Sequence, residues 1–320
     1  MLGRKLAERL ALDRRLGGAA IDRLSLVDAM SPSRPAGATF EVAELVADLA
    51  DPGVAEQALM DRPDVVFHLA AVVSGEAEAD FEKGYRVNLD GTRRLLEAIR
   101  AAGGGYRPRV VFSSSIAVFG APFPDVIGDD FCATPLTSYG TQKAIDELLL
   151  SDYSRRGFCD GVGIRLPTIC VRPGTPNLAA SGFFSNIIRE PLNGREAILP
   201  VADDVRHWFA SPRAAIAFLV HAATLETSAL GNRRCLTMPG LSATVAEQIA
   251  ALRRAAGDDV VSLIRREPDA SIASIVAGWP QAFETSRADA LGFRAEADFD
   301  EIIRVYVEDE LAGRIGAAAR

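Results

Sequence analysis

Short apolar segments alternate with amphipathic segments along the first half of the chain. The apolar segments are 24–27, 64–69, 109–112 and 163–166. The amphipathic segments, in which apolar residues recur at helical spacing, are 2–16, 52–60, 91–102 and 139–156. Short strands separated by helices are typical of βαβ units, whose parallel strands are covered by helices on both faces. The pattern therefore predicts an α/β fold built on a doubly wound parallel sheet.

The first amphipathic segment begins at residue 1, and no strand precedes it. Residues 1–16 are rich in arginine, which is also a feature of organelle transit peptides. The segment contains Glu8 and Asp13, however, and it has neither serine nor threonine. Because its leucines recur at helical spacing, we interpret it as a packed helix.

The alternation loosens after about residue 174. Further helices are predicted over 182–193, 211–226 and 299–311, and further strands over 233–238 and 260–264. Thr244 and Glu247 form a capping-box pattern, which indicates the start of another helix. No Gly/Ser-rich linker separates the two halves. We therefore expect one domain over 1–174 and a smaller α/β substrate-binding lobe over 175–320, with some of its segments returning to the main sheet.

Composition narrows the classes of function. The 320 residues carry 35 Lys and Arg against 43 Asp and Glu, a net charge of −8, which argues against binding to nucleic acid or anionic membranes. Four scattered cysteines and three histidines make a zinc site or a disulfide framework improbable, and we expect a cytoplasmic protein. No apolar run approaches the length of about 20 residues that spans a bilayer.

One constellation carries chemistry. Ser113, Ser114 and Ser115 directly follow the predicted strand 109–112, and Tyr139 and Lys143 lie four residues apart on one predicted helix face. A buried ammonium beside the phenol favours tyrosinate, which acts as a base near neutral pH. The alternative is a surface Tyr/Lys pair, because this spacing also arises by chance in helices.

The surrounding motifs resemble a known family, and they occur in its order. They are Asp28, Asp48-Leu49, His68 to Ala71, Val87 to Thr92, Phe112 to Ser115, Tyr139 with Lys143, Arg165 to Thr168, Arg172 to Gly174, and Ala290 to Phe293. With them the chain resembles the extended short-chain dehydrogenases/reductases of the NAD-dependent epimerase/dehydratase type along essentially its whole length. The resemblance implies a Rossmann-like fold, with the NAD-binding domain over 1–174.

The resemblance implies which residues bind NAD. They are Gly3, Asp28, Asp48, Leu49, Leu69, Ala70, Ala71, Asn88, Ser113, Tyr139, Lys143, Pro167 and Thr168. Asp28 would hold the adenosine ribose and repel a 2′-phosphate, which favours NAD over NADP; the alternative is a solvated turn residue. Asp48 and Leu49 would line the adenine pocket, although Asp48 is also a candidate helix N-cap.

Two further positions have alternative readings. Leu69, Ala70 and Ala71 would let the backbone approach the cofactor, or they simply pack in the core. Asn88 would brace the catalytic helix or hold a relay water, or it caps a helix. Ser115, the third serine, matches the family's catalytic position. The implied catalytic residues are Ser115, Tyr139 and Lys143, and no metal is expected.

The Gly-rich phosphate turn of the family, GxxGxxG, is absent except for its final glycine, Gly3. That turn and the strand before it would supply backbone N–H groups to the pyrophosphate. The resemblance therefore leads us to expect that the functional protein is longer by about ten residues, with a strand and a GxxGxx turn ahead of Leu2.

The substrate is indicated by a finer resemblance. Segments 165–177, 183–192 and 238–247 resemble the group of this family that oxidises D-erythronate, a four-carbon sugar acid, at C2. A carboxylate substrate favours an arginine fork, for which Arg172 and Arg206 are candidates, together with Ser115 and Tyr139 at the reacting hydroxyl. Either arginine is equally a candidate for a structural ion pair.

The sequence therefore predicts NAD-dependent oxidation of a small sugar acid by a homodimer. The dimer would form through helices 91–102 and 139–156. Two other functions stay open at this point. One is a nucleotide-sugar epimerase or dehydratase that keeps NAD bound through each cycle. The other is a non-catalytic NAD-binding protein.

Overall fold

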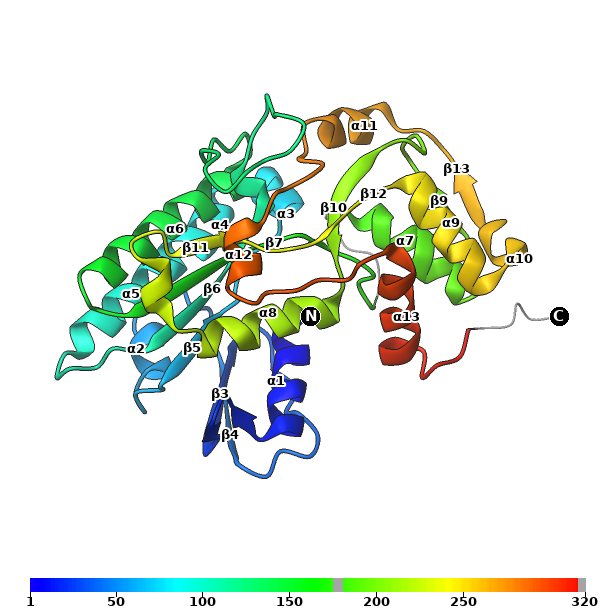
Figure 1. Ribbon diagram of the computed structural model, residues 1–320. Helices are drawn as coiled ribbons and strands as arrows, with labels where there is room; N and C mark the ends of the chain where they lie inside the picture. The colour runs from blue at the N-terminus through cyan, green and yellow to red at the C-terminus, as the bar shows by residue number, and fades with distance from the viewer. Residues whose placement is uncertain (175–180, 316–320) are drawn as a thin grey trace. The chain divides into compact units, whose positions relative to one another are not determined.

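The computed structural model describes residues 1–174 and 181–315, and these residues cluster into two units (Figure 1). The first unit comprises 1–118, 135–165 and 216–236. The second comprises 119–134, 166–215 and 237–320. This clustering differs from a division at residue 174, because the chain passes between the units several times. Residues 175–180, where the second domain was expected to begin, lie outside the described residues.

The first unit contains the predicted parallel strands, and this confirms the α/β fold class. Strand β3 (Arg23–Asp28) pairs in parallel with β4 (Glu41–Val46), with Arg23 opposite Glu41. A four-stranded sheet has the order β11-β7-β6-β5, and its β5 and β6 are parallel, with Val65 opposite Arg109. Its strands are β5 (Val65–His68), β6 (Arg109–Ser115), β7 (Asp160–Leu166) and β11 (Cys235–Thr237). A small hairpin joins β1 (Arg15–Leu16) to β2 (Ala19–Ala20).

The helices of this unit include the four that the apolar periodicity predicted, with α1 and α2 shorter than expected. They are α1 (Leu2–Asp13), α2 (Val54–Ala58), α3 (Ser74–Ala79), α4 (Phe81–Gly84), a π-helical turn (Tyr85–Asp90), α5 (Gly91–Ala102) and α6 (Ser138–Arg155). Two 3₁₀ turns lie at Ile116–Val118 and Thr227–Leu230. Helix α1 ends before the expected residue 16, because Arg14 adopts a left-handed conformation (φ 56°) and its N–H bonds the Leu10 carbonyl.

The core of the first unit lies between α5 and the four-stranded sheet. Leu95, Leu96 and Ile99 of α5 are buried in one cluster with Val110 and Phe112 of β6. Truncation of such a side chain to alanine typically costs about 2–5 kcal/mol, because it leaves a cavity. This packing fixes α5 against the strand that ends in the three serines.

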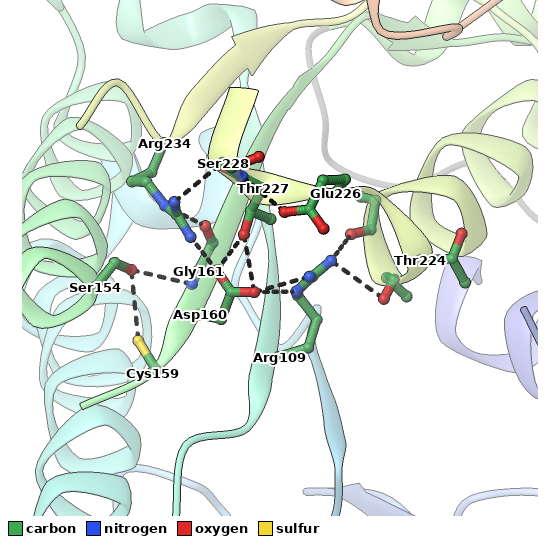
Figure 2. A network of polar contacts seen from close by, with 12 residues as sticks. Arg109, Ser154, Cys159, Asp160, Gly161, Thr224, Glu226, Thr227, Ser228 and Arg234 are labelled. Carbon is green, nitrogen blue, oxygen red and sulfur yellow. Dashed lines mark hydrogen bonds and ion pairs between the residues drawn. The ribbon is translucent and has the colours of Figure 1, made fainter. Parts of the chain in front are cut away.

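A partly buried network of polar contacts attaches segment 216–236 to the sheet (Figure 2). Arg109 of β6 donates from Nη2 to Asp160 Oδ2 of β7 at 2.8 Å and from Nη1 to the Ala222 carbonyl at 2.9 Å. Arg234 pairs with the other oxygen of Asp160, and Thr227 donates to it at 2.7 Å. Partial burial opposes ionisation of Asp160, but the Thr227 hydroxyl and the two guanidinium groups outweigh it and lower the pKa.

The second unit has its own sheets and helices. Its strands are β8 (Thr168–Ile169), β9 (Ala197–Leu199), β10 (Arg206–Ala210), β12 (Leu241–Thr244) and β13 (Ile264–Arg266). Strand β10 pairs with β8 in parallel and with β12 antiparallel, while β9 and β13 form a parallel pair. The helices are α7 (Gly182–Leu192), α9 (Val245–Ala256), α10 (Asp258–Val261), α11 (Ala270–Ala277), α12 (Ser286–Ala290) and α13 (Phe299–Glu310). Helix α8 (Pro212–Thr224) begins in this unit and continues into the first.

Two predictions for the second half of the chain had different outcomes. Thr244 and Glu247 form the predicted capping box, with the Glu247 N–H donating to Thr244 Oγ1 at 3.1 Å. The strand expected over 260–264 is wrong: Asp258–Val261 is helix α10, and β13 begins only at Ile264. The two aspartates ahead of Val260 favour the N-terminus of a helix. None of the helices in 1–174 or 181–315 combines the length and the apolar character that crossing a membrane requires.

Candidate active site

The three serines lie inside strand β6, which extends to Ser115, and not after the strand as expected. Side chains alternate between the two faces of a strand, so Ser114 points away from the other two. The Ser114 hydroxyl is buried and donates to Glu147 Oε1 of α6 at 2.5 Å. Ser113 donates to the His68 carbonyl at 3.2 Å, whereas Ser115 Oγ accepts from the Ala117 N–H at 3.1 Å.

Helix α6 places Tyr139 and Lys143 one turn apart. It begins after Thr137, whose hydroxyl accepts from the Gly140 N–H at 3.0 Å. Gly140 packs directly against the Ala117 carbonyl, so that a Cβ at this position would overlap the carbonyl oxygen. The absence of a side chain at Gly140 therefore lets the first turn of α6 approach the segment that follows Ser115. The sequence analysis missed this residue, whose only signal was its place directly after Tyr139.

Lys143 is buried beneath the site, with 1% of its surface exposed. Its Nζ lies 4.6 Å from the centroid of the Phe112 ring and 5.8 Å from that of the Tyr139 ring. Burial lowers the pKa of Lys143, and the nearby carboxyl groups of Asp146 and Glu147 oppose this shift. In the part of the chain that the structure describes, Lys143 forms no ion pair with either carboxyl group. Its Nζ lies within the range of a cation–π contact with both aromatic rings.

Asn88 connects α6 to the loop after β5. Its Oδ1 accepts from the Val72 N–H at 2.8 Å, and its Nδ2 donates to Gln142 Oε1 at 2.7 Å. Gln142 is fully buried and precedes Lys143 directly. These bonds brace the helix that carries Tyr139, which was one of the roles considered for Asn88. Gln142 itself was not singled out from the sequence.

A second buried polar chain lies behind Lys143. His68 Nε2 lies 2.8 Å from Thr92 Oγ1, and Thr92 Oγ1 lies 3.2 Å from Asp146 Oδ2. Burial, with a smaller contribution from the charge of Lys143, lowers the pKa of His68 to about 3, so the imidazole is neutral. Burial also raises the pKa of Asp146. Sequence reasoning missed this chain, although Asp146 stands one helical turn after Lys143.

The expected cofactor residues of the first unit lie at strand and helix ends. Asp28 ends β3 with an exposed side chain, and its Oδ1 accepts from the Met30 N–H at 3.0 Å. Gly3 lies in the first turn of α1, where an added Cβ would be 4.0 Å from Leu69 Cδ1. Ala70 and Ala71 are exposed after β5 and do not pack in the core, whereas Leu69 is half-buried. An exposed carboxylate, a helix start and small residues fit the ribose and phosphate groups of a dinucleotide.

Asp48 forms a local turn and does not cap a helix. Its Oδ1 accepts from the Ala50 N–H at 2.9 Å, and its Oδ2 pairs with Arg86 Nη2 at 2.8 Å. Partial burial opposes ionisation, but the Ala50 N–H and Arg86 together lower the pKa of Asp48. The N-cap of α2 is Gly53, so the expected alternative of an Asp48 cap is wrong. Leu49 is half-buried against the core of the first unit.

The remaining expected site residues belong to the second unit. Pro167 is buried, and Thr168 Oγ1 lies 2.7 Å from His207 Nε2. Arg172 donates from Nε to the Ile169 carbonyl at 3.0 Å and from Nη2 to Ser181 Oγ at 2.6 Å. Arg206 Nη2 lies 3.4 Å from Glu247 Oε2, so Arg206 already takes part in an ion pair. His207 is buried, and this lowers its pKa to about 4.

Comparison with known proteins agrees with this architecture. The profile of the NAD dependent epimerase/dehydratase family matches residues 1–227. The chain is 52% identical to D-erythronate dehydrogenase from Cupriavidus necator, covering 96% of this chain and 94% of that protein. It is 40% identical to D-erythronate dehydrogenase from Haemophilus influenzae, covering 97% of this chain and 96% of that protein.

A solved structure shows the same likeness. The chain is 62% identical to a protein from Agrobacterium tumefaciens described as a nucleoside-diphosphate-sugar epimerase. The two structures align with a TM-score of 0.96, covering 98% of this chain and 93% of that one. The family match covers more than half of the chain, and the curated relatives cover nearly all of it. The chain therefore belongs to the NAD dependent epimerase/dehydratase family, as its motifs led us to expect, and is an enzyme of that family with NAD as its cofactor.

Proposed function

We propose that this protein oxidises a small sugar acid at its C2 hydroxyl, with D-erythronate as substrate and 2-oxo-tetronate as product. The observation that carries the proposal is the buried Lys143 beneath Tyr139, on a helix that packs against the segment after Ser115. The two relatives named D-erythronate dehydrogenase support the choice of substrate. In the reaction the C2–H and O–H bonds break and a carbonyl forms, and NAD when bound accepts the hydride as the proton leaves.

Tyr139 is the proposed base. As tyrosinate it takes the proton of the C2 hydroxyl, and the positive charge of Lys143 stabilises the tyrosinate. Ser115 accepts the Ala117 N–H through a lone pair, so its own proton can be donated to the substrate oxygen. Asn88 and Gln142 hold the helix in place and do not touch the substrate in this mechanism.

The proposed NAD site follows the family motifs. Asp28 holds the adenosine ribose, Asp48 and Leu49 border the adenine, and Gly3 with Leu69, Ala70 and Ala71 borders the phosphates. Asn88, Ser113, Tyr139 and Lys143 complete the nicotinamide end, to which the family resemblance adds Pro167 and Thr168. The carboxylate of Asp28 gives the expected preference for NAD over NADP, since it repels a 2′-phosphate.

Arg172 and Arg206 are the proposed partners of the substrate carboxylate. Arg206 is ion-paired with Glu247, so a substrate would compete with that carboxylate. Arg172 is held by a backbone carbonyl and a serine hydroxyl, which orient its guanidinium. We expect both arginines to contribute to substrate binding, with the contribution of Arg206 limited by its pair with Glu247.

A second candidate function is a nucleotide-sugar epimerase or dehydratase with tightly bound NAD. The likeness to the Agrobacterium tumefaciens protein, described as a nucleoside-diphosphate-sugar epimerase, favours it. The two functions differ in the fate of the reduced cofactor, because an epimerase oxidises NADH again before the product leaves.

The test is a panel of tetronates and pentonates with NAD, followed by NADH absorbance. We expect stoichiometric release of NADH with D-erythronate, and none from a Tyr139→Phe control. Conversion of a nucleotide sugar without NADH release, together with no turnover of any sugar acid, would establish the second candidate.

We also propose a cytoplasmic homodimer. All four cysteines are free thiols, which suits a reducing compartment. Leu148 on α6 is 72% exposed, and it supports an interface along α5 and α6. Leu95, Leu96 and Ile99 of α5 do not contribute to such an interface, because they are buried in the core of the first unit. Light scattering at micromolar concentration decides between a dimer and a monomer.

A further inference from the structure

The hydroxyl of Thr92 is surrounded by three polar partners. Its Oγ1 lies 2.6 Å from the Asn88 carbonyl oxygen, 2.8 Å from His68 Nε2 and 3.2 Å from Asp146 Oδ2. Thr92, His68 and Asp146 are all buried. A hydroxyl has one proton to donate and two lone pairs that accept. The protons of the Thr92 hydroxyl, the His68 ring and the Asp146 carboxyl group can therefore be assigned to positions.

The shortest contact fixes the proton of Thr92. The Asn88 carbonyl can only accept, and it stands four residues before Thr92, as in the usual back-bond of a helical threonine. Thr92 therefore donates to Asn88, and its lone pairs face His68 and Asp146. Neutral His68 must then carry its proton on Nε2 and donate it to Thr92.

Asp146 Oδ2 faces the remaining lone pair of Thr92. An ionised carboxylate there would set two acceptor oxygens against each other in a dry environment, which is unfavourable. A carboxylic acid instead donates its proton to Thr92, so that the proton and both lone pairs of the Thr92 hydroxyl form hydrogen bonds. Asp146 Oδ1 has no hydrogen-bond partner. This is tolerable for the carbonyl oxygen of a neutral acid and costly for a buried carboxylate.

From this geometry we infer that Asp146 is held as a neutral carboxylic acid that donates its proton to the Thr92 hydroxyl. In this form Asp146 acts as a positioning residue, because it does not offset the positive charge of Lys143 beneath Tyr139. The inference rests on the proposed roles of Tyr139 and Lys143. An ionised Asp146, one helical turn from Lys143, would offset the positive charge that favours tyrosinate.

The charged groups around Asp146 act on it in opposite directions. On α6, Lys143 favours the carboxylate and Glu147 favours the acid. Glu147 is itself paired with Arg165 of β7, which lies 2.7 Å from Oε2, and accepts from the Ser114 hydroxyl. From β5 the cluster is faced by His68, which is neutral. Burial is the largest influence and raises the pKa of Asp146 in spite of Lys143 and the Thr92 hydrogen bond, which is the direction that the hydrogen-bond geometry requires.

The first test measures the protonation state without using activity. Asp146→Asn keeps the shape of the side chain and donates to Thr92 from Nδ2, but it cannot titrate. If native Asp146 is neutral, the folded protein holds a proton that the unfolded chain releases above about pH 4, so stability falls as pH rises. Asp146→Asn does not lose stability in this way as pH rises, because its side chain has no proton to release. Its melting temperature relative to that of the native protein should therefore increase steadily from pH 5 to pH 8.

The control for this test lies on the same helix. Asp152 is exposed and pairs with Arg155, so Asp152→Asn should give a difference in melting temperature that stays flat over the same pH range. A flat difference for Asp146→Asn as well would overturn the inference, because it would show that Asp146 is ionised in the folded protein.

The second test asks whether Asp146 works in its neutral form. Asp146→Asn should keep kcat within about threefold of the native value and leave the acidic limb of the pH–rate profile in place. A folded variant that loses more than about tenfold in kcat, or whose acidic limb moves by a full pH unit, would contradict the neutral role. Failure of the proposed sugar-acid activity would leave the melting-temperature test decisive for Asp146.

Discussion

Glu147 and Arg165 form an ion pair between α6 and β7, with Arg165 Nη2 2.7 Å from Glu147 Oε2. The Glu147 side chain is 8% exposed and that of Arg165 is 15% exposed. Arg165 also donates from Nε to Glu147 Oε1 at 2.9 Å, so the contact is bidentate. Loss of one partner would break these hydrogen bonds and remove one charge of a largely buried ion pair.

Glu147→Gln is therefore expected to lower the free energy of unfolding by about 3 kcal/mol, the cost typical of breaking one side of a buried pair. Urea denaturation at pH 7 measures it. Asp152→Asn is the control, because its pair with Arg155 is exposed and should contribute little. Equal effects of the two substitutions would show that the buried pair does not hold α6 to the sheet.

Tyr139→Phe should lower kcat by about 10²–10⁴ while the affinity for NAD stays within a few-fold, because in the proposed mechanism the phenol transfers the proton and the ring only borders the site. Lys143→Ala should damage both, since Lys143 supports Tyr139 and the cofactor. Steady-state kinetics and calorimetric titration with NAD measure the two effects. More than a tenth of native activity in Tyr139→Phe would show that another group is the base.

Asp28→Ala should narrow the preference for NAD over NADP, mainly by weakening NAD. The exposed carboxylate at the end of β3 offers acceptors to ribose hydroxyls and repels a phosphate. The ratio of kcat/KM for the two cofactors measures this preference. If the native enzyme used both cofactors equally well, Asp28 would have no part in discrimination.

Clear periodicity gave the right elements, whereas two strand assignments made from short apolar runs were wrong at an end or in kind. The amphipathic pattern of 91–102 gives helix α5 with the expected bounds, because one face carries the leucines that fill the core. Strand β6 continues through Ser115 although the apolar pattern stops at Phe112, since polar side chains at the end of a strand leave no hydrophobic signal. The apolar run 260–264 is too short to distinguish a helix from a strand, and it was assigned wrongly.

From the sequence we predicted the charged and reactive residues of the candidate site, but not the buried residues that surround them. Ser115, Tyr139 and Lys143 were singled out because family motifs and spacing identify them. Gln142 and Asp146 flank Lys143 on the same helix, but a sequence does not say that both are buried or that they meet Asn88 and Thr92. The residues of each pair stand 54 positions apart, and they meet because α6 packs against α5 and against the π-helical turn that precedes it.

His68 should make the protein sensitive to acid. Burial and the charge of Lys143 lower its pKa from 6.5 to about 3. The unfolded chain therefore binds a proton below about pH 6.5 that the folded protein refuses until about pH 3. His68 therefore makes its full contribution to the free energy of unfolding above pH 6.5. As pH falls from 6.5 to about 3, the free energy of unfolding decreases by up to about 5 kcal/mol.

The measurement is the free energy of unfolding between pH 4 and pH 7 for the native protein and for His68→Gln. We expect a shallower pH dependence in the variant, because it cannot take up this proton. The same slope in native protein and His68→Gln would mean that His68 is already protonated in the folded state.

Arg172→Lys is expected to raise KM for the sugar acid by about tenfold or more, with a smaller effect on kcat and none on KM for NAD. A lysine keeps the charge but loses the two parallel N–H groups that bind a carboxylate. Arg206→Lys should raise KM by no more than about threefold, because Arg206 is already paired with Glu247. Both substitutions preserve charge, so a difference between them reports on geometry rather than on the net field of the site. A larger effect from Arg206→Lys would instead place the substrate carboxylate at Arg206, with Glu247 as the group that it displaces.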